Sequence, residues 1–119
     1  MVKDYKELEV WKKGILLVLA IYEAIKKFPK DEHYALADQI KRAAVSIPSN
    51  IAEGASRNTT KEFIQFLYIA LGSASELETQ IIIAEKLGYM KNEEALLSKI
   101  TIIRKMLNAL ISSLKKQNI

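Results

Sequence analysis

The stretch SIPSNIAEGASRN, residues 46–58, decides the fold of this chain. It places a proline, two asparagines and a glycine where the flanking apolar pattern predicts a helix. Pro48 has no backbone N–H, so the carbonyl of Ala44 loses its helical partner and the ring crowds that turn. Ile47 and Ile51 lie one turn apart on either side of the proline, so the apolar stripe stays in phase. We therefore expect one kinked helix rather than two helices.

Working outward, four segments have apolar residues that recur about every 3.6 positions, with no alternating strand pattern between them. We expect helices over residues 8–28 and 32–55, from just after Thr60 to about Leu87, and over 92–116. The core positions that this pattern predicts are Leu36, Ile40, Ala43, Ile47, Ile51 and Ala55 in the second segment, Phe63, Phe66, Leu67, Ala70, Leu77, Ile81 and Ala84 in the third, and Leu96, Ile100, Ile103, Leu107, Leu110 and Leu114 in the fourth.

Local signals mark the ends of these helices. Pro29 disfavours helical geometry at Phe28 and ends the first segment, and Asp31 can cap the second. The pattern Thr59-x-x-Glu62 is a capping box for the third, which a left-handed glycine at Gly88 ends. The connections are only a few residues long, so consecutive helices should be antiparallel neighbours. The sequence predicts one all-α domain over residues 1–119, an antiparallel up-down-up-down four-helix bundle.

Composition excludes several kinds of site. The chain has no cysteine and one histidine, so it can form neither a disulfide nor a site with two imidazoles. It has no phosphate-binding glycine loop, nucleophile elbow or His-Glu-x-x-His motif. We expect no enzyme activity and no cofactor. The apolar run 15–22 is far shorter than the ~20 residues that span a bilayer, and the acids before it argue against a signal peptide. We expect a cytoplasmic protein with no membrane partner.

Three segments have more apolar residues than one buried face needs. The first is apolar at every position from 15 to 22. The extra residues elsewhere are Ile64, Tyr68, Ile69, Leu71, Ile82 and Ile83 in the third segment and Ile102, Met106, Ala109 and Ile111 in the fourth. Scattered surface hydrophobics are common, but stripes on three helices favour self-association into a homo-oligomer.

Polar residues of the second segment also recur at helical spacing. Together with part of the third segment they form a candidate structural polar network, whose members are Gln39, Arg42, Ser46, Asn50, Glu53, Ser73 and Glu76. Antiparallel pairing would bring Arg42 near Glu76 and Asn50 near the Gly72–Gln65 region. The alternative is that these side chains face water. Their small size and the scarcity of lysine favour a close, hydrogen-bonded helix contact.

The net charge of +4 is unevenly spread. In an up-down-up-down bundle, the start of the first helix, the second turn and the end of the last helix share one end. The bases gathered there are Lys3, Lys6, Lys12, Lys13, Arg57, Lys61, Lys115 and Lys116, against the acids Asp4, Glu7, Glu9, Glu53 and Glu62. Such an excess, repeated in an oligomer, attracts phosphate backbones without base readout. The alternative is that the lysines only keep the bundle soluble.

The motif around the opening stretch resembles a known family. The matching residues are Gln39 to Ala43, Ser46 to Gly54, Arg57, Glu62 to Ser73 and Glu76 to Gln80. They are similar to the bacterial four-helix-bundle family whose first members were found encoded in intervening sequences of 23S ribosomal RNA genes. The resemblance implies a bundle that assembles into a ring-shaped homopentamer and has no enzyme activity. That family is in turn similar to the accessory variability determinant protein of diversity-generating retroelements, a pentamer that binds nucleic acid and a reverse transcriptase.

Two functions follow as hypotheses. The first is a non-enzymatic, oligomeric, pentameric bundle that binds RNA or DNA through its basic end by backbone electrostatics. The alternative is a protein-interaction scaffold with no nucleic-acid role, whose protein partner the sequence does not name. An enzyme of unrecognised type is the third and least supported hypothesis.

Overall fold

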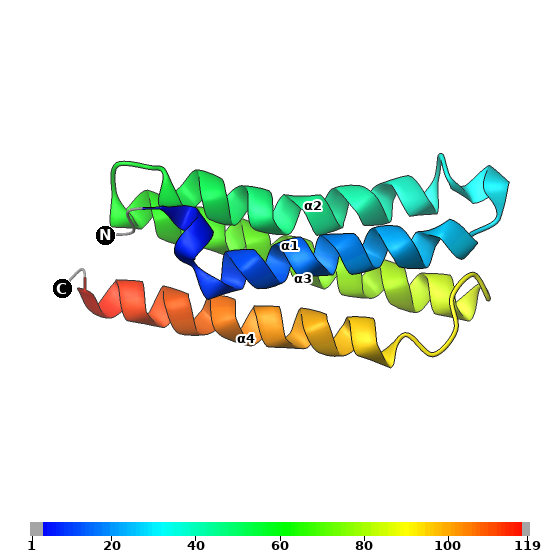
Figure 1. Ribbon diagram of the computed structural model, residues 1–119. Helices are drawn as coiled ribbons and strands as arrows, with labels where there is room; N and C mark the ends of the chain where they lie inside the picture. The colour runs from blue at the N-terminus through cyan, green and yellow to red at the C-terminus, as the bar shows by residue number, and fades with distance from the viewer. Residues whose placement is uncertain (1–3, 118–119) are drawn as a thin grey trace.

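The computed structural model describes residues 4–117 as a bundle of long antiparallel helices (Figure 1). The elements are α1 (Glu9–Ala24), α2 (Leu36–Ala55), α3 (Thr60–Lys86) and α4 (Glu94–Gln117), with the short 3-10 turns η1 (Tyr5–Glu7), η2 (Ile25–Lys27) and η3 (Lys30–Glu32). Both α1 and α3 pack against α2 and α4, so α1 and α3 are diagonal to each other. The predicted all-α, up-down-up-down bundle is confirmed, and it is elongated, at 49 × 22 × 19 Å.

The predicted ends of α3 are confirmed. The Thr59 hydroxyl accepts a hydrogen bond from the Glu62 backbone N–H at 3.2 Å and donates to its carboxylate at 2.9 Å. At the other end, Gly88 adopts φ +82°, and the Tyr89 N–H donates to the carbonyl of Ala84 at 2.9 Å. A left-handed residue followed by this bond is the usual glycine cap of a helix. Local chemistry therefore explains both boundaries.

The predicted start of α2 is wrong by one turn. The helix begins at Leu36 rather than Glu32, and Ala35, with φ −124° and ψ −103°, is its N-cap and makes no side-chain hydrogen bond. Asp31 therefore does not cap it. The reason is a long-range contact, because the Glu32 carboxylate accepts a hydrogen bond at 2.9 Å from the hydroxyl of Tyr89, in the α3–α4 connection. This contact holds η3 against the α3–α4 connection, so α2 begins one turn later than predicted.

Two other boundaries differ from the prediction. Asn92 has φ +54°, in the left-handed region, so α4 cannot begin there and starts at Glu94. The α-helical part of the first segment ends at Ala24 and continues to Lys27 only as the 3-10 turn η2. Phe28, before the proline, is extended as expected, at φ −66° and ψ 150°.

The proline does not break α2, which runs as one helix through Pro48. Its ring is buried against α1 at Gly14, where an added Cβ would stand only 3.3 Å from the Pro48 Cβ. The absence of a side chain at Gly14 thus makes room for the ring. Close packing of the ring offsets part of the cost of the lost helical hydrogen bond.

The core follows the predicted stripes with a few shifts. Leu36, Ala55, Phe66 and Leu110 are half-buried rather than buried. In α4, Ile111 is buried instead of Leu110. The buried stripe runs from Leu107 to Ile111, four residues later, and then to Leu114, three residues after that. Residues assigned to an extra stripe can therefore belong to the core. The largest fully buried side chains are Phe63, Leu17, Ile21, Ile25, Ile40, Ile47, Ile51, Leu67, Leu77, Ile81, Ile100 and Ile103.

Candidate nucleic-acid interface

One end of the bundle gathers the predicted basic residues. Figure 1 shows the start of α1, the α2–α3 turn and the end of α4 together at this end. We call it the basic end, and its described bases are Lys6, Lys12, Lys13, Arg57, Lys61, Lys115 and Lys116. Lys3 lies outside the described residues. The topology thus brings the predicted elements together.

Two of these cations form ion pairs with acids that precede them by three or four residues. Lys12 lies 3.4 Å from Glu9, and Arg57 lies 2.7 Å from Glu53. The Arg57 guanidinium also lies 4.8 Å from the centre of the Phe66 ring, across the α2–α3 turn. These charges are exposed, and exposed ion pairs contribute little to stability. Glu9 and Glu53 therefore compete only weakly with a phosphate for Lys12 and Arg57.

A third cation has an aromatic partner that the sequence did not predict. The Lys115 ammonium donates to the Tyr68 hydroxyl at 2.8 Å and lies 5.3 Å from the centre of that ring. Tyr68 was assigned only to the extra apolar stripe of α3. Lys6, on η1, lies 6.0 Å from the Tyr5 ring centre. Only the folded bundle brings residues 68 and 115 together, so no local signal could have revealed the first pair.

Three exposed lysines of this end have no such partner. Within residues 4–117, no carboxylate lies within ion-pair distance of Lys13, Lys61 or Lys116. They come from α1, α3 and α4 respectively, so they surround the end rather than cluster on one helix. A phosphate that reaches this end meets ammonium groups that no neighbouring acid neutralises by direct contact.

The predicted polar network exists in a smaller form, as a seam between α2 and α3. The hydroxyls of Ser46 and Ser73 are 2.8 Å apart and hydrogen-bonded. The Asn50 amide donates to the Ser46 backbone carbonyl at 2.8 Å and to its hydroxyl at 2.9 Å. Ser73 is buried, and hydrogen bonds of this kind are what buried polar groups require. The seam holds α2 against α3.

The structure does not bring Gln39, Arg42 or Glu53 into this seam. Arg42 is 81% exposed and pairs with Asp38 at 3.1 Å instead of reaching Glu76. An acid four residues before a base on one helix is the favourable arrangement for such a pair. Glu53 pairs with Arg57 in the same way, and Gln39 is exposed. Local partners on α2 therefore replace the predicted cross-helix ones.

Glu76 takes part in a second polar contact on α3. Its carboxylate accepts a hydrogen bond at 3.3 Å from the amide nitrogen of Gln80, one turn later. Gln80 is buried, and its amide oxygen has no hydrogen-bond partner among the described residues. Both residues therefore extend the polar side of α3 beyond Ser73 without reaching α2.

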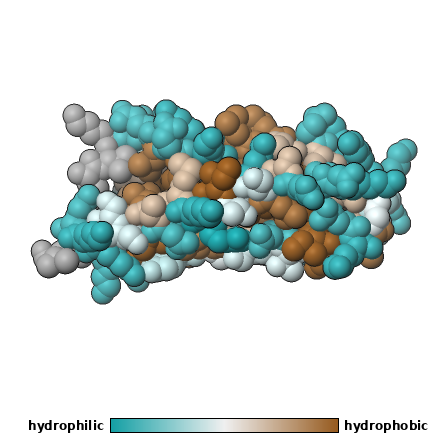
Figure 2. Space-filling view, turned by 90° about the horizontal axis from the view of Figure 1, so that it is seen from below, coloured by the Kyte–Doolittle hydropathy of each residue, from teal (hydrophilic) through white to brown (hydrophobic). Residues whose placement is uncertain are grey.

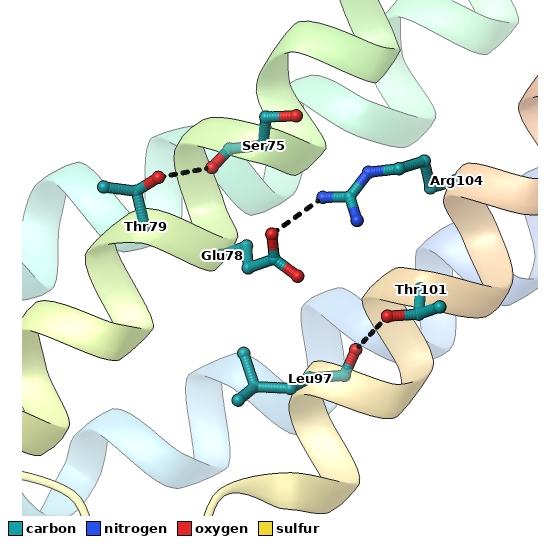
Figure 3. A network of polar contacts seen from close by, with 6 residues as sticks. All are labelled: Ser75, Glu78, Thr79, Leu97, Thr101 and Arg104. Carbon is teal, nitrogen blue, oxygen red and sulfur yellow. Dashed lines mark hydrogen bonds and ion pairs between the residues drawn. The ribbon is translucent and has the colours of Figure 1, made fainter.

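A further ion pair joins α3 to α4 and was not predicted. Arg104 donates to the Glu78 carboxylate at 3.1 Å, with side chains 28% and 32% exposed (Figure 3). The nearby hydroxyl of Thr79 donates to the carbonyl of Ser75 within its own helix. Such a half-buried pair between helices is better shielded than the pairs at the basic end, so its role is to hold α3 against α4.

Apolar side chains remain exposed on the two diagonal helices. On α1, Leu16 and Leu19 are 57% and 62% exposed. On α3, Tyr68, Ile69 and Ile83 are 47%, 50% and 43% exposed. Figure 2 views the bundle from the side on which Figure 1 draws α4, and it shows apolar surface between the polar side chains on that face too. Since α1 and α3 are diagonal, their exposed apolar faces point to opposite sides of the bundle.

Two further properties concern metals and membranes. Among residues 4–117, no group of three or more acidic or histidine side chains is placed to hold a metal ion. Of the helices in this part of the chain, none has the length and apolarity that crossing a membrane requires.

The fold and the basic end define a four-helix-bundle protein with a charged tip and apolar flanks. Residues 6–109 match the family described as 23S rRNA-intervening sequence protein, and the chain belongs to this family. It is also similar to the crystal structure of a protein of unknown function from the S23 ribosomal protein family of Bacteroides thetaiotaomicron. The two share 27% sequence identity with a TM-score of 0.80, over 87% of this chain and 95% of the other. A comparison with curated proteins finds no significant match.

Proposed function

We propose that this chain is a non-enzymatic, self-associating bundle of the cytoplasm that binds the phosphate backbone of RNA or DNA through its basic end. The observation that carries the nucleic-acid role is the set of unpaired lysines, Lys13, Lys61 and Lys116, contributed by three helices to one end. Lysines that neutralise phosphates release counterions, and that release drives binding without sequence preference.

Self-association is supported by the exposed apolar faces of α1 and α3. Leu19 lies beside the exposed Ile15, Leu16 and Tyr22 on α1, and Ile83 lies beside the exposed Ile82 on α3, with Leu87 just past the helix end. Two different faces on opposite sides of a subunit suit a head-to-tail contact, which closes into a ring when the rotation between subunits allows it. A ring with all its basic ends on one side would present their combined charge to a polyanion.

The number of subunits rests on family resemblance. A ring of five copies, and a likeness to the accessory variability determinant protein of diversity-generating retroelements, are what the resemblance carried by the matching residues between Gln39 and Gln80 suggests. The same resemblance lends support to nucleic acid as the ligand. The ring of five copies and nucleic acid as the ligand belong to the proposal, as does the absence of enzyme activity.

The nucleic-acid role is tested by binding of generic RNA and DNA at several salt concentrations. The test variant changes Lys13, Lys61 and Lys116 to glutamine. The matched control changes Lys27, Lys86 and Lys91, three exposed lysines from the opposite end of the bundle, and alters the net charge equally. Fluorescence anisotropy of a labelled oligonucleotide gives the dissociation constant of each protein.

We expect the wild type to bind more weakly as salt rises, and the test variant to lose affinity and about three units of the logarithmic salt slope, one per lysine. The control should keep both within experimental error. Equal losses in the two variants would show that only net charge matters. No binding by the wild type at low salt would favour the alternative, a protein-interaction scaffold in which the lysines are solubilising.

A further inference from the structure

A shallow surface cavity of about 270 Å³ lies between α1 and α2 next to the basic end. Its lining is mostly apolar and includes the two aromatic rings that the sequence places before and within the first turn of α1. The lining residues are Tyr5, Trp11, Ile15, Val18, Val45, Pro48, Ser49 and Ala52. We call this cavity the aromatic slot. The proposed backbone contacts make no use of it.

The aromatic rings of the slot hold each other in place. The centroids of Tyr5 and Trp11 are 5.5 Å apart at 65°, an edge-to-face arrangement. Both residues are half-buried, so part of each side chain remains accessible. The floor includes Pro48, which Gly14 contacts from α1. The slot is therefore preorganised by the same proline that distinguishes α2.

The slot also has polar groups at its edge. Within residues 4–117, neither the Tyr5 hydroxyl, the Trp11 indole N–H nor the Ser49 hydroxyl has a hydrogen-bond partner. An apolar wall with a few unpaired donors and acceptors is the usual composition of a site for a small planar group. A nucleobase has this chemistry, with a flat apolar face and a polar edge.

We propose that the aromatic slot receives one unstacked base of single-stranded RNA or DNA, an inference that rests on the proposed nucleic-acid role of the basic end. The base packs against the rings of Tyr5 and Trp11, and its edge meets Ser49. Aromatic side chains beside a basic surface are how sequence-tolerant single-strand binding is commonly built. A base in a duplex is already stacked and paired, and cannot enter the slot without being extruded.

Two lysines beside the slot can contact the phosphates that flank a bound base, a contact that an apolar protein side chain does not offer. The Lys6 ammonium lies 6.0 Å from the Tyr5 ring centre, and Lys12 follows Trp11 directly in α1. The neighbouring acids are Asp4, Glu7 and Glu9, of which Asp4 caps η1 and Glu9 pairs with Lys12. The backbone on either side of a bound base would therefore run past Lys6 and on toward the unpaired lysines of the basic end.

Trp11 is the only tryptophan of the chain and reports on the slot directly. We would titrate the full-length protein with three probes of equal length, about 15 nucleotides. The probes are oligo-dT (with oligo-rU in parallel), the same phosphodiester chain with abasic sites, and a random-sequence duplex. Tryptophan fluorescence measures occupancy of the slot, and anisotropy of a label on the probe measures total binding.

The slot predicts that only the base-bearing single strands quench Trp11, and that they bind on the order of five- to 100-fold more tightly than the abasic strand. Tyr5→Leu should remove most of that preference while leaving the abasic affinity unchanged. Tyr34→Ala, which removes a 94% exposed tyrosine far from the slot, is the control and should change neither.

Two results would overturn the slot while leaving the basic end intact. One is equal affinity for the base-bearing and abasic strands without quenching of Trp11. The other is a preference for base-bearing strands that Tyr5→Leu leaves unchanged, which would show that the bases bind elsewhere. Failure of all three probes to bind at low salt would overturn both the slot and the proposed nucleic-acid role.

Discussion

Gly54 of α2 lies so close to Phe66 of α3 that an added Cβ would stand 2.6 Å from the Phe66 Cβ. The same Cβ would stand 3.0 Å from a ring carbon of Phe63. Real Cβ atoms essentially never lie as close as 2.6 Å to a neighbouring carbon, so these two helices approach closely at the α2–α3 turn because Gly54 has no side chain. This contact explains the glycine of the opening motif in terms of packing.

Gly54→Ala should destabilise the protein by about 1–3 kcal/mol, because the methyl group forces the phenylalanine rings or the backbone to shift. Gly72→Ala is the matched control. Nothing lies within 4 Å of its added Cβ, so in a helix interior it should stabilise by about 0.5–1 kcal/mol. Urea unfolding followed by circular dichroism measures both. Equal effects would show that the α2–α3 approach is looser than described.

Arg104→Gln should cost about 1 kcal/mol of the free energy of unfolding, because it leaves the half-buried Glu78 carboxylate without its partner. Arg42→Gln removes an arginine whose side chain is 81% exposed and should cost no more than about 0.5 kcal/mol. The same unfolding experiment at low and high salt compares them. A larger effect of Arg42→Gln would contradict the shielding assigned to the α3–α4 pair.

The hydrogen bond to Glu32 raises the pKa of Tyr89 above its ordinary value of 10.0, and desolvation and the charges of Glu32 and Asp31 act in the same direction. A raised pKa in the folded state means that the contribution to stability is complete below pH 10 and is lost as pH rises through the raised value. The stability difference between wild type and Tyr89→Phe should therefore shrink above pH 10. A difference that stays constant from pH 8 to 11 would contradict this linkage.

The sequence was sufficient for the fold because local chemistry agrees with the global pattern. The apolar stripe stays in phase across Pro48. The Thr59 cap fixes the start of α3 and Gly88 fixes its end, both through local contacts. The sequence misplaced the start of α2 because Glu32 bonds to Tyr89, which is 57 positions away.

The candidate site was less predictable for the same reason. Topology alone brings the basic elements to one end, so the lysines could be grouped from the sequence. The partners of these lysines could not be predicted, because residues such as Lys115 and Tyr68 meet only across the packed bundle. For Arg42 the cross-helix prediction failed since a closer partner, Asp38, lies on the same helix.

Head-to-tail association predicts that a charge on either face dissociates the oligomer and that the two altered chains can still pair with each other. Leu19→Glu and Ile83→Glu should each dissociate the oligomer, because a carboxylate in a desolvated contact is costly. A mixture of the two should form pairs, since the first variant keeps its α3 face and the second its α1 face. Analytical ultracentrifugation of the separate and mixed variants measures this. A mixture that stays monomeric would contradict a contact between the two different faces.

The mass of the wild-type protein in solution tests the central claim most directly. For the proposed ring of five copies, light scattering at micromolar concentration should give about five times the 13.5 kDa of one chain. A mass of one chain under the same conditions would contradict self-association and would remove the combined charge of the basic ends on which the proposed function draws.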